Sequence, residues 1–123
     1  MMQRNLVKPP KNKESTRAYS DAQEKSVCKA LGAMQQPSSG SGHFRKGDVC
    51  TRSFLIECKC AMSSKDSFSI RKDWIEKNGD EAFSIRKPNT AIAFNFGPDS
   101  PNYYVINERL MRFLVETLES DKD

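Results

Sequence analysis

The segment GDVCTRSFLIECKC, residues 47–60, constrains the fold more than any other part of the chain. Its apolar and β-branched residues predict two strands joined by a tight turn. With the turn between Arg52 and Ser53, Asp48 lies opposite Glu57, and their Cβ atoms are about 4.5–5.5 Å apart. Because Arg-Ser is a weak turn signal, the register could slip by a residue or more, but any short connection keeps the two acids close. The same register pairs Val49 with Ile56 and Cys50 with Leu55.

The second strand of this hairpin carries different chemistry on its two sides. Side chains alternate along a strand, so Glu57 and Lys59 share one face. The other face takes Ile56, Cys58 and Cys60. Facing carboxylates repel unless a cation lies between them, and Mg²⁺ favours one or two carboxylates together with water and phosphate oxygens. The segment therefore predicts a divalent-cation site with an ammonium group at its rim. The alternative is a surface cluster of ion pairs.

The segment SDAQEKSVCKALGAM predicts a helix from about Asp21 to about Met34. Ser20 followed three residues later by Gln23 is typical of a capping box. Glu24 shares the apolar side of this helix, where a carboxylate without a cationic partner would be costly. We therefore expect Glu24 to meet a cation or the ammonium group of the hairpin; the alternative is a first-turn acid favoured by the helix dipole. The apolar residues with helical spacing are Val27, Cys28, Leu31 and Met34.

The remainder of the chain predicts further loops, strands and helices. Residues 35–47 are rich in Gly, Ser and Pro and predict a loop, while residues 68–87 start extended and become a helix. Residues 89–97 and 103–106 predict two strands, and Asn107 caps a last helix. The order α-β-β-α-β-β-α predicts an α/β fold with a mixed β-sheet flanked by helices. The apolar stripe of the last helix comprises Leu110, Phe113, Leu114 and Leu118.

Length, charge and hydropathy limit the organisation of the chain. Its 123 residues allow one domain. No apolar run approaches the roughly 18 residues that span a bilayer, and the start lacks an apolar signal core. We therefore expect no membrane association and a cytoplasmic location, which for a phage-encoded protein is the host cytoplasm.

The net charge of +4 arises entirely from residues 1–19, which hold five basic residues and one acidic residue. This asymmetry predicts a basic, flexible N-terminal arm at residues 1–19 and a folded domain at residues 20–120. The arm suits a polyanion such as nucleic acid, and a solubilising disordered tail is the alternative. The four cysteines have poor spacing for zinc, so we expect reduced thiols in the core.

Several of these features, in this order, resemble the PD-(D/E)xK nuclease superfamily. They are Glu24 on a helix, the loop SSGSG, Asp48 at the start of a strand, and the Glu-x-Lys sequence ECK at residues 57–59. Within that superfamily the chain is similar to the small Holliday junction resolvases of the archaeal and phage type, from about residue 20 to residue 106. The resemblance implies a restriction-endonuclease-like fold.

The resemblance also implies a role for each motif residue. Asp48 and Glu57 would bind Mg²⁺, for which Mn²⁺ is expected to substitute, together with the backbone carbonyl of Cys58. Glu24 matches the helix acid that binds or supports the metal. Lys59 matches the lysine that orients or activates the attacking water and stabilises charge on the phosphate.

The implied function is structure-selective DNA hydrolysis by a homodimer, which resolves four-way (Holliday) junctions in DNA recombination by paired nicks with 5′-phosphate ends. The alternatives are a related nuclease acting on other branched or duplex DNA, and a non-catalytic DNA-binding protein on a nuclease fold. Residues 91–97 and the last helix, with Phe113 and Leu114, are candidates for the dimer surface, although we prefer them as core. The residues expected to contact DNA, or else to remain solvated, are Ser39, Ser41, Arg45, Lys46, Arg71 and Lys72.

Overall fold

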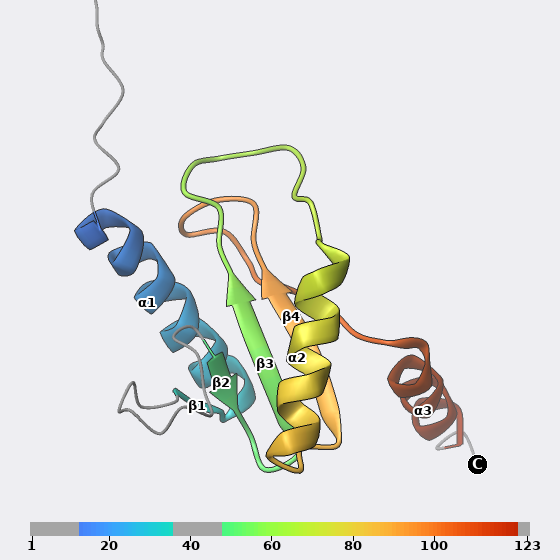
Figure 1. The fold of residues 1–123 in the computed structure, drawn as a ribbon. Coiled ribbons are helices and arrows are strands. Elements are labelled where there is room, and N and C mark those ends of the chain that lie inside the picture. Colours follow the sequence, from blue (N-terminus) through green and yellow to red (C-terminus); the bar gives the residue numbers. More distant parts are fainter. Residues whose placement is uncertain (1–12, 36–47, 121–123) are drawn as a thin grey trace, which may run out of the picture.

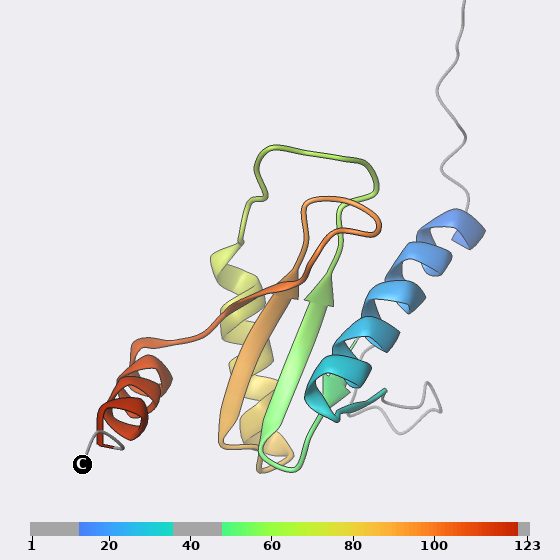
Figure 2. The same ribbon diagram turned by 180° about the vertical axis from the view of Figure 1, so that it is seen from behind.

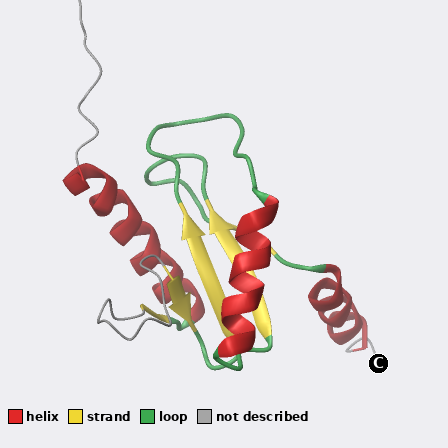
Figure 3. Cartoon of the chain, in the orientation of Figure 1, coloured by secondary structure: helices red, strands yellow, loops and turns green. Residues whose placement is uncertain are grey.

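The structure, a computed structural model, describes residues 13–35 and 48–120. Within these ranges the chain forms three helices and five strands (Figures 1 and 3). The fold is of the predicted α/β class, and a short additional strand, β1, precedes the predicted hairpin. In chain order the elements are α1 (Lys13–Leu31), β1 (Met34–Gln35), β2 (Asp48–Cys50), β3 (Phe54–Lys59), α2 (Lys72–Ser84), β4 (Asn89–Phe94), β5 (Tyr103–Val105) and α3 (Glu108–Ser120).

The five strands form one mixed sheet in the order β1-β2-β3-β4-β5. Strands β3 and β4 are parallel and are connected through α2, whereas the other neighbouring strands pair antiparallel. Helices α1 and α2 cover opposite faces of the sheet, as the two opposed views show (Figures 1 and 2). This confirms the predicted mixed sheet flanked by helices. None of the helices in the described ranges combines the length and apolar character that crossing a membrane requires.

The β2–β3 hairpin has the register that the sequence predicts. Asp48 pairs with Glu57, Val49 with Ile56, and Cys50 with Leu55. The backbone N–H of Thr51 donates to the carbonyl of Phe54 (3.1 Å), which places the turn at Arg52 and Ser53. The Thr51 hydroxyl oxygen also accepts hydrogen bonds from the backbone N–H groups of Ser53 (3.2 Å) and Phe54 (3.0 Å). This local hydrogen bonding explains why a weak Arg-Ser turn still closes tightly.

One apolar cluster of the core lies between α1 and the sheet. Its buried members are Val27 of α1 and four strand residues: Val49, Ile56, Ala91 and Ala93. Cys28 and Cys58 pack against this cluster. None of the four cysteines, all within the described ranges, forms a disulfide, as expected for reduced thiols, but all four are partly buried and not core residues. Because strand side chains alternate, Glu57 and Lys59 point to the opposite face, toward α2. The predicted separation of thiols and charged groups on β3 is therefore confirmed.

Helix α1 starts earlier than the sequence predicts, at Lys13 rather than about Asp21. The prediction of its start was wrong because Ser20 is not a capping residue. Ser20 lies inside the helix, where its hydroxyl is 3.9 Å from the Cys60 thiol. The amide of Gln23 points into the sheet instead of back to the helix start, and it donates to the carbonyl of Lys59 (2.9 Å).

Helix α1 also ends earlier than predicted. Gly32 adopts a φ of 65°, a left-handed conformation that glycine tolerates at a helix end. The backbone N–H of Ala33 then donates to the carbonyl of Cys28 (3.1 Å), which is the hydrogen bond of a Schellman cap. Met34, expected in the helix, therefore belongs to β1, where it pairs with Cys50.

Helix α3 begins as predicted but is mostly exposed. The side-chain oxygen of Asn107 accepts a hydrogen bond from the backbone N–H of Leu110 (2.8 Å), which confirms the cap. Of the predicted apolar stripe only Leu110 is buried; Phe113 and Leu118 are 60% and 67% exposed. The preference for α3 as core was therefore wrong beyond Leu110, because an apolar stripe does not specify what covers it. Strand β4, by contrast, lies between β3 and β5, and its residues 91–93 are buried.

Candidate active site

Two carboxylates lie opposite each other on neighbouring strands. Asp48 begins β2, and its Cα partner on β3 is Glu57. The two residues are only 2% and 8% exposed. The Thr51–Phe54 hydrogen bond fixes the alternation of the ladder, so the Asp48–Glu57 pair is a non-hydrogen-bonded pair, in which side chains approach more closely. Two adjacent buried carboxylates repel each other, and a cation between them relieves the repulsion.

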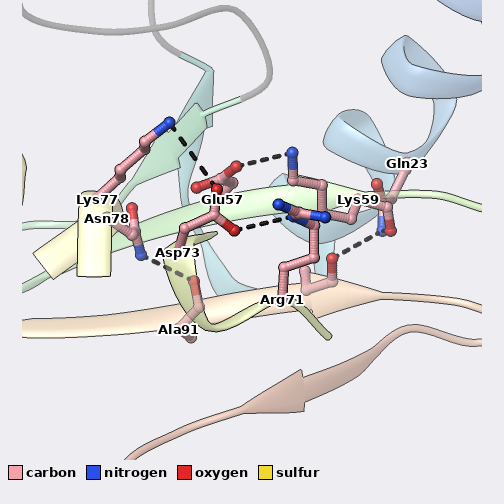
Figure 4. Close-up of polar contacts among 9 residues, drawn as sticks. Gln23, Glu57, Lys59, Arg71, Asp73, Lys77, Asn78 and Ala91 are labelled. Carbon is pink, nitrogen blue, oxygen red and sulfur yellow. Dashed lines mark hydrogen bonds and ion pairs between the residues drawn. The ribbon is translucent and has the colours of Figure 1, made fainter. Parts of the chain in front are cut away.

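Lys59 supplies positive charge beside this acid pair. Its Nζ lies 2.9 Å from Oε2 of Glu57, two residues earlier on the same face of β3 (Figure 4). The Lys59 side chain is 31% exposed, so the ammonium group is partly removed from water. Its Nζ also lies over the indole ring of Trp74, 4.5 Å from the ring centroid. Trp74 belongs to the first turn of α2, so β3 and α2 together position this ammonium group.

Glu24 lies on the α1 side of the sheet, across from the face toward which the acid pair points. It is buried on α1, where its Oε1 accepts a hydrogen bond from the side-chain amide of Gln35 (2.9 Å). Burial, followed by the charges of Glu24 and Asp48, raises the pKa of the Cys58 thiol well above its ordinary value. Both carboxylates therefore lie within electrostatic range of the same thiol, which belongs to the α1 side of the sheet.

The structure thus brings together Asp48, Glu57 and Lys59. Within residues 13–35 and 48–120, no group of three or more His, Cys, Asp or Glu side chains lies close enough together to hold a metal ion. The role of Glu24 as a metal ligand stays a prediction. Two carboxylates are nevertheless sufficient for Mg²⁺, which keeps several water ligands and completes its shell with substrate phosphate oxygens.

The backbone carbonyl of Cys58 points toward the β2 side of β3, next to the acid pair. In the non-hydrogen-bonded pair with Asp48, the backbone groups of Glu57 point away from β2, so those of the next residue, Cys58, point toward it. Asp48 is the first residue of β2 and the first described residue after position 35. The Cys58 carbonyl therefore lies where it could contribute an oxygen ligand next to the acid pair.

Exposed basic side chains surround the start of α2. Arg71 and Lys72 are exposed, and the Nε of Arg71 lies 2.9 Å from Oδ1 of Asp73. This hydrogen bond lowers the pKa of the Asp73 carboxyl group below its ordinary value. Lys77, one turn further along, is 3.9 Å from the other Asp73 oxygen (Figure 4). Arg71 and Lys72 thus lie at the same end of α2 as Trp74. The other predicted DNA contacts, Ser39, Ser41, Arg45 and Lys46, lie outside the described residues.

Two buried amides, which the sequence did not reveal, join the helices to the parallel strand pair. Nε2 of Gln23 donates to the carbonyls of Lys59 (2.9 Å) and Ala93 (3.3 Å) from the α1 side. Nδ2 of Asn78 donates to the carbonyls of Leu55 (3.3 Å) and Ala91 (3.2 Å) from the α2 side. The sequence signal that could have indicated these buried amides is helical spacing. Gln23 lies one helical turn before buried Val27, and Asn78 lies one helical turn before buried Ala82.

The comparisons with known proteins add no relative. No protein-family model, no curated protein and no solved structure matches the chain. The fold and site therefore define the class on their own: a mixed α/β domain with a buried carboxylate pair and a lysine on adjacent strands.

Proposed function

We propose that the chain is a divalent-cation-dependent endodeoxyribonuclease. One observation carries this proposal: Asp48 and Glu57 are buried opposite each other, and the Lys59 ammonium group lies 2.9 Å from Glu57. Two carboxylates directly opposite each other repel, and a cation between them relieves this repulsion. A site that binds a cation and a phosphodiester does need this combination of anionic ligands and a mobile positive charge.

The residues fit Mg²⁺ or Mn²⁺ as the cation. Asp48 and Glu57 would hold it with the carbonyl of Cys58, and Glu24 would support it from α1. When bound, such a cation supplies Lewis acidity and lowers the pKa of its water. Lys59 contributes the ammonium group that faces the negative charge developing on the phosphate, where one well-placed donor is typically worth a rate factor of about 100 to 1,000.

The proposed substrate is branched DNA, with the four-way junction as the preferred form. The support is the resemblance of Glu24, Asp48 and the ECK sequence to PD-(D/E)xK junction resolvases, together with a mixed sheet covered by helices on both faces. The exposed Arg71 and Lys72 would contact DNA phosphates beside the site and would thereby position the backbone without reading bases. Cleavage would leave 5′-phosphate ends, and the enzyme would meet its DNA in the cytoplasm.

The proposed active form is a homodimer, because a four-way junction has near two-fold symmetry and needs two opposed nicks. Strand β4 cannot supply the dimer surface, since it lies inside the sheet. Helix α3 suits the role because it exposes adjacent apolar side chains, which are unusual on a monomer surface. They are Met111, Phe113, Leu114, Val115 and Leu118.

The deciding experiment compares a four-way junction with a linear duplex of the same sequence in the presence of Mg²⁺. We expect paired nicks in the junction that disappear with EDTA. Asp48→Asn and Lys59→Met should each lower the cleavage rate about 100-fold or more while DNA binding persists. Asp80→Asn, which changes an exposed acid of α2, is the matched control and should cleave normally.

Other outcomes separate the alternatives. Equal cleavage of the linear duplex would indicate a nuclease of different substrate preference. A metal-independent shift of DNA without cleavage would indicate a DNA-binding protein and would overturn the enzymatic proposal. For the dimer, sedimentation analysis should give twice the monomer mass, and Phe113→Asp should lower it to that of the monomer; an unchanged mass in this variant would exclude α3 as the dimer surface.

A further inference from the structure

We propose that Trp74 is a positioning residue that retains the Lys59 ammonium group at the acid pair, and that a divalent cation bound by the pair moves this ammonium group from Glu57 toward the indole ring. The inference rests on the cation site of the proposed function, but it concerns a residue to which neither the motif nor the resemblance gives a role. Its evidence is the pair of contacts that Lys59 makes and the way in which the indole ring is held.

The Lys59 ammonium group has two alternative partners. Its Nζ is 2.9 Å from Oε2 of Glu57 and 4.5 Å from the centroid of the Trp74 ring. An ammonium group within about 6 Å of a tryptophan ring centroid is attracted to the negative face of the ring, and the attraction grows with desolvation. Partial burial of Lys59 therefore strengthens both contacts.

The indole ring is fixed relative to the strand that carries Lys59. Trp74 contacts Phe68, with ring centroids 6.4 Å apart, and Phe68 stacks on Phe94 at 5.3 Å. Phe94 is the Cα partner of Lys59 in the parallel β3–β4 pair. Phe94 in turn contacts Phe96 (5.5 Å) and Tyr103 (5.8 Å), so the ring of Trp74 is the end of a cluster of five aromatic side chains.

Binding of a divalent cation would compete directly with Lys59. A cation on Asp48 and Glu57 claims the carboxylate oxygens of Glu57, one of which is now the ion partner of the ammonium group. Like-charge repulsion then drives the ammonium group away. A lysine side chain has a flexible four-carbon stem and would otherwise move into solvent. The indole face offers a second partner that keeps the ammonium group within reach of the phosphate.

Trp74 is the only tryptophan of the chain, so its fluorescence reports this contact directly. We expect titration with Mg²⁺ alone, without DNA, to change the emission of the wild-type protein. Lys59→Met, which keeps most of the stem but removes the charge, should alter the emission without metal and lose at least half of the Mg²⁺ response. Asp48→Asn should abolish the Mg²⁺ response while leaving the metal-free spectrum close to that of the wild type.

Kinetics test the positioning role. Trp74→Leu should lower the kcat for junction cleavage about 2- to 30-fold with little change in the KM for DNA, and Trp74→Phe should restore most of the rate because it keeps an aromatic face. Ile75→Ala, the neighbouring half-exposed residue of α2, is the matched control and should cleave normally. Circular dichroism of each variant verifies folding.

The outcomes distinguish this inference from the proposed function. Normal cleavage by Trp74→Leu, or an Mg²⁺ response in Lys59→Met equal to that of the wild type, would overturn the inference and leave the nuclease proposal standing. A wild-type protein that cleaves no DNA but shows an Mg²⁺ response dependent on both Asp48 and Lys59 would refute the nuclease proposal. It would still support the proposed movement of the Lys59 ammonium group from Glu57 toward Trp74.

Discussion

The two faces of the sheet are built from the same strands, but only one of them buries a pair of facing carboxylates. Toward α1, the side chains of Val49, Ile56 and Ala93 are apolar and almost completely buried. Toward α2, Leu55 and Ile92 are almost completely buried as well. The α2 face also buries Asp48 and Glu57 next to a partly exposed lysine. Because side chains alternate along a strand, Ile56 lies in the apolar core and the next residue, Glu57, lies in the candidate site on the other face.

This difference adds a cost to one face of the sheet only. Burial of an aliphatic side chain contributes about 1.5–3 kcal/mol, whereas burial of a carboxylate costs free energy that a partner must offset. Apolar side chains on both faces, including Leu55 and Ile92 toward α2, therefore supply the stability with which the α2 face can hold its acids. Predictions that change one kind of side chain at a time test this division.

Ile56→Ala should have the largest effect on folding. Ile56 is 1% exposed, and truncating a buried isoleucine typically costs about 2–5 kcal/mol of unfolding free energy. The comparison on the charged side is Lys59→Met, which removes the ammonium partner of the buried Glu57 carboxylate and should cost less, about 1–3 kcal/mol, because Lys59 itself is partly exposed. Urea denaturation monitored by circular dichroism measures both. Equal losses would show that the Glu57–Lys59 ion pair contributes as much stability as the buried isoleucine and would break the comparison.

The buried amides should produce the next largest effects, and here the faces should behave alike. Gln23→Ala and Asn78→Ala each leave strand carbonyls without a buried donor, at an expected cost of about 1–3 kcal/mol of unfolding free energy. Lys77→Ala changes the exposed neighbour of Asn78 and should alter the unfolding free energy by no more than about 0.5 kcal/mol. If either amide substitution costs less unfolding free energy than this control limit, the helix that carries the amide is held to the strands by packing alone.

Local patterns predicted the hairpin well but not the amides. The Asp48–Glu57 register follows from strand alternation and a two-residue turn, both of which depend on neighbouring residues. Strand β1 was missed because two residues carry no periodicity. The early start of α1 was missed because its first turns, up to Ser20, lack an apolar stripe. In that case a plausible capping motif gave the wrong boundary.

Nonlocal contacts explain the remaining differences. The contact of Lys59 with Trp74 depends on the β3–α2–β4 crossover, which returns the start of α2 over the end of β3. No spacing within either segment encodes that approach. The amphipathic pattern of α3 was read correctly as a helix, yet the pattern does not specify whether the rest of this chain covers its stripe, and Phe113 is exposed.

Asp48→Asn should abolish cleavage while it changes the stability of the metal-free protein little. The substitution relieves the repulsion with Glu57 but also removes the charge that Asp48 presents to its other neighbours, so the unfolding free energy should stay within about 1 kcal/mol of that of the wild type. Denaturation in EDTA measures this change. With Mg²⁺ the wild type should become more stable than the variant, because only the wild type gains stability from the bound cation. A loss of more than about 1 kcal/mol in EDTA would indicate that Asp48 has a structural role.

The Cys58 thiol should show that the acids of the site influence the apolar face. Burial first, and then the charges of Glu24 and Asp48, raise its pKa above the ordinary value of 9.0. A raised pKa in the folded state means that the thiol contributes stability fully below 9.0 and loses this contribution as the pH rises toward the folded-state pKa. The unfolding free energy should therefore fall by about 0.4 kcal/mol between pH 7 and pH 9, where half of the unfolded thiols are ionised.

Cys58→Ala should remove this part of the pH dependence, and denaturation at a series of pH values measures the slope. Alkylation adds a second measurement, because a buried, protonated thiol reacts slowly. Asp48→Asn lowers the Cys58 pKa by removing one of its causes, so the alkylation of Cys58 should become faster in that variant. An unchanged rate would mean that the charge of Asp48 does not affect the Cys58 thiol on the other face of the sheet, and that burial alone sets the Cys58 pKa.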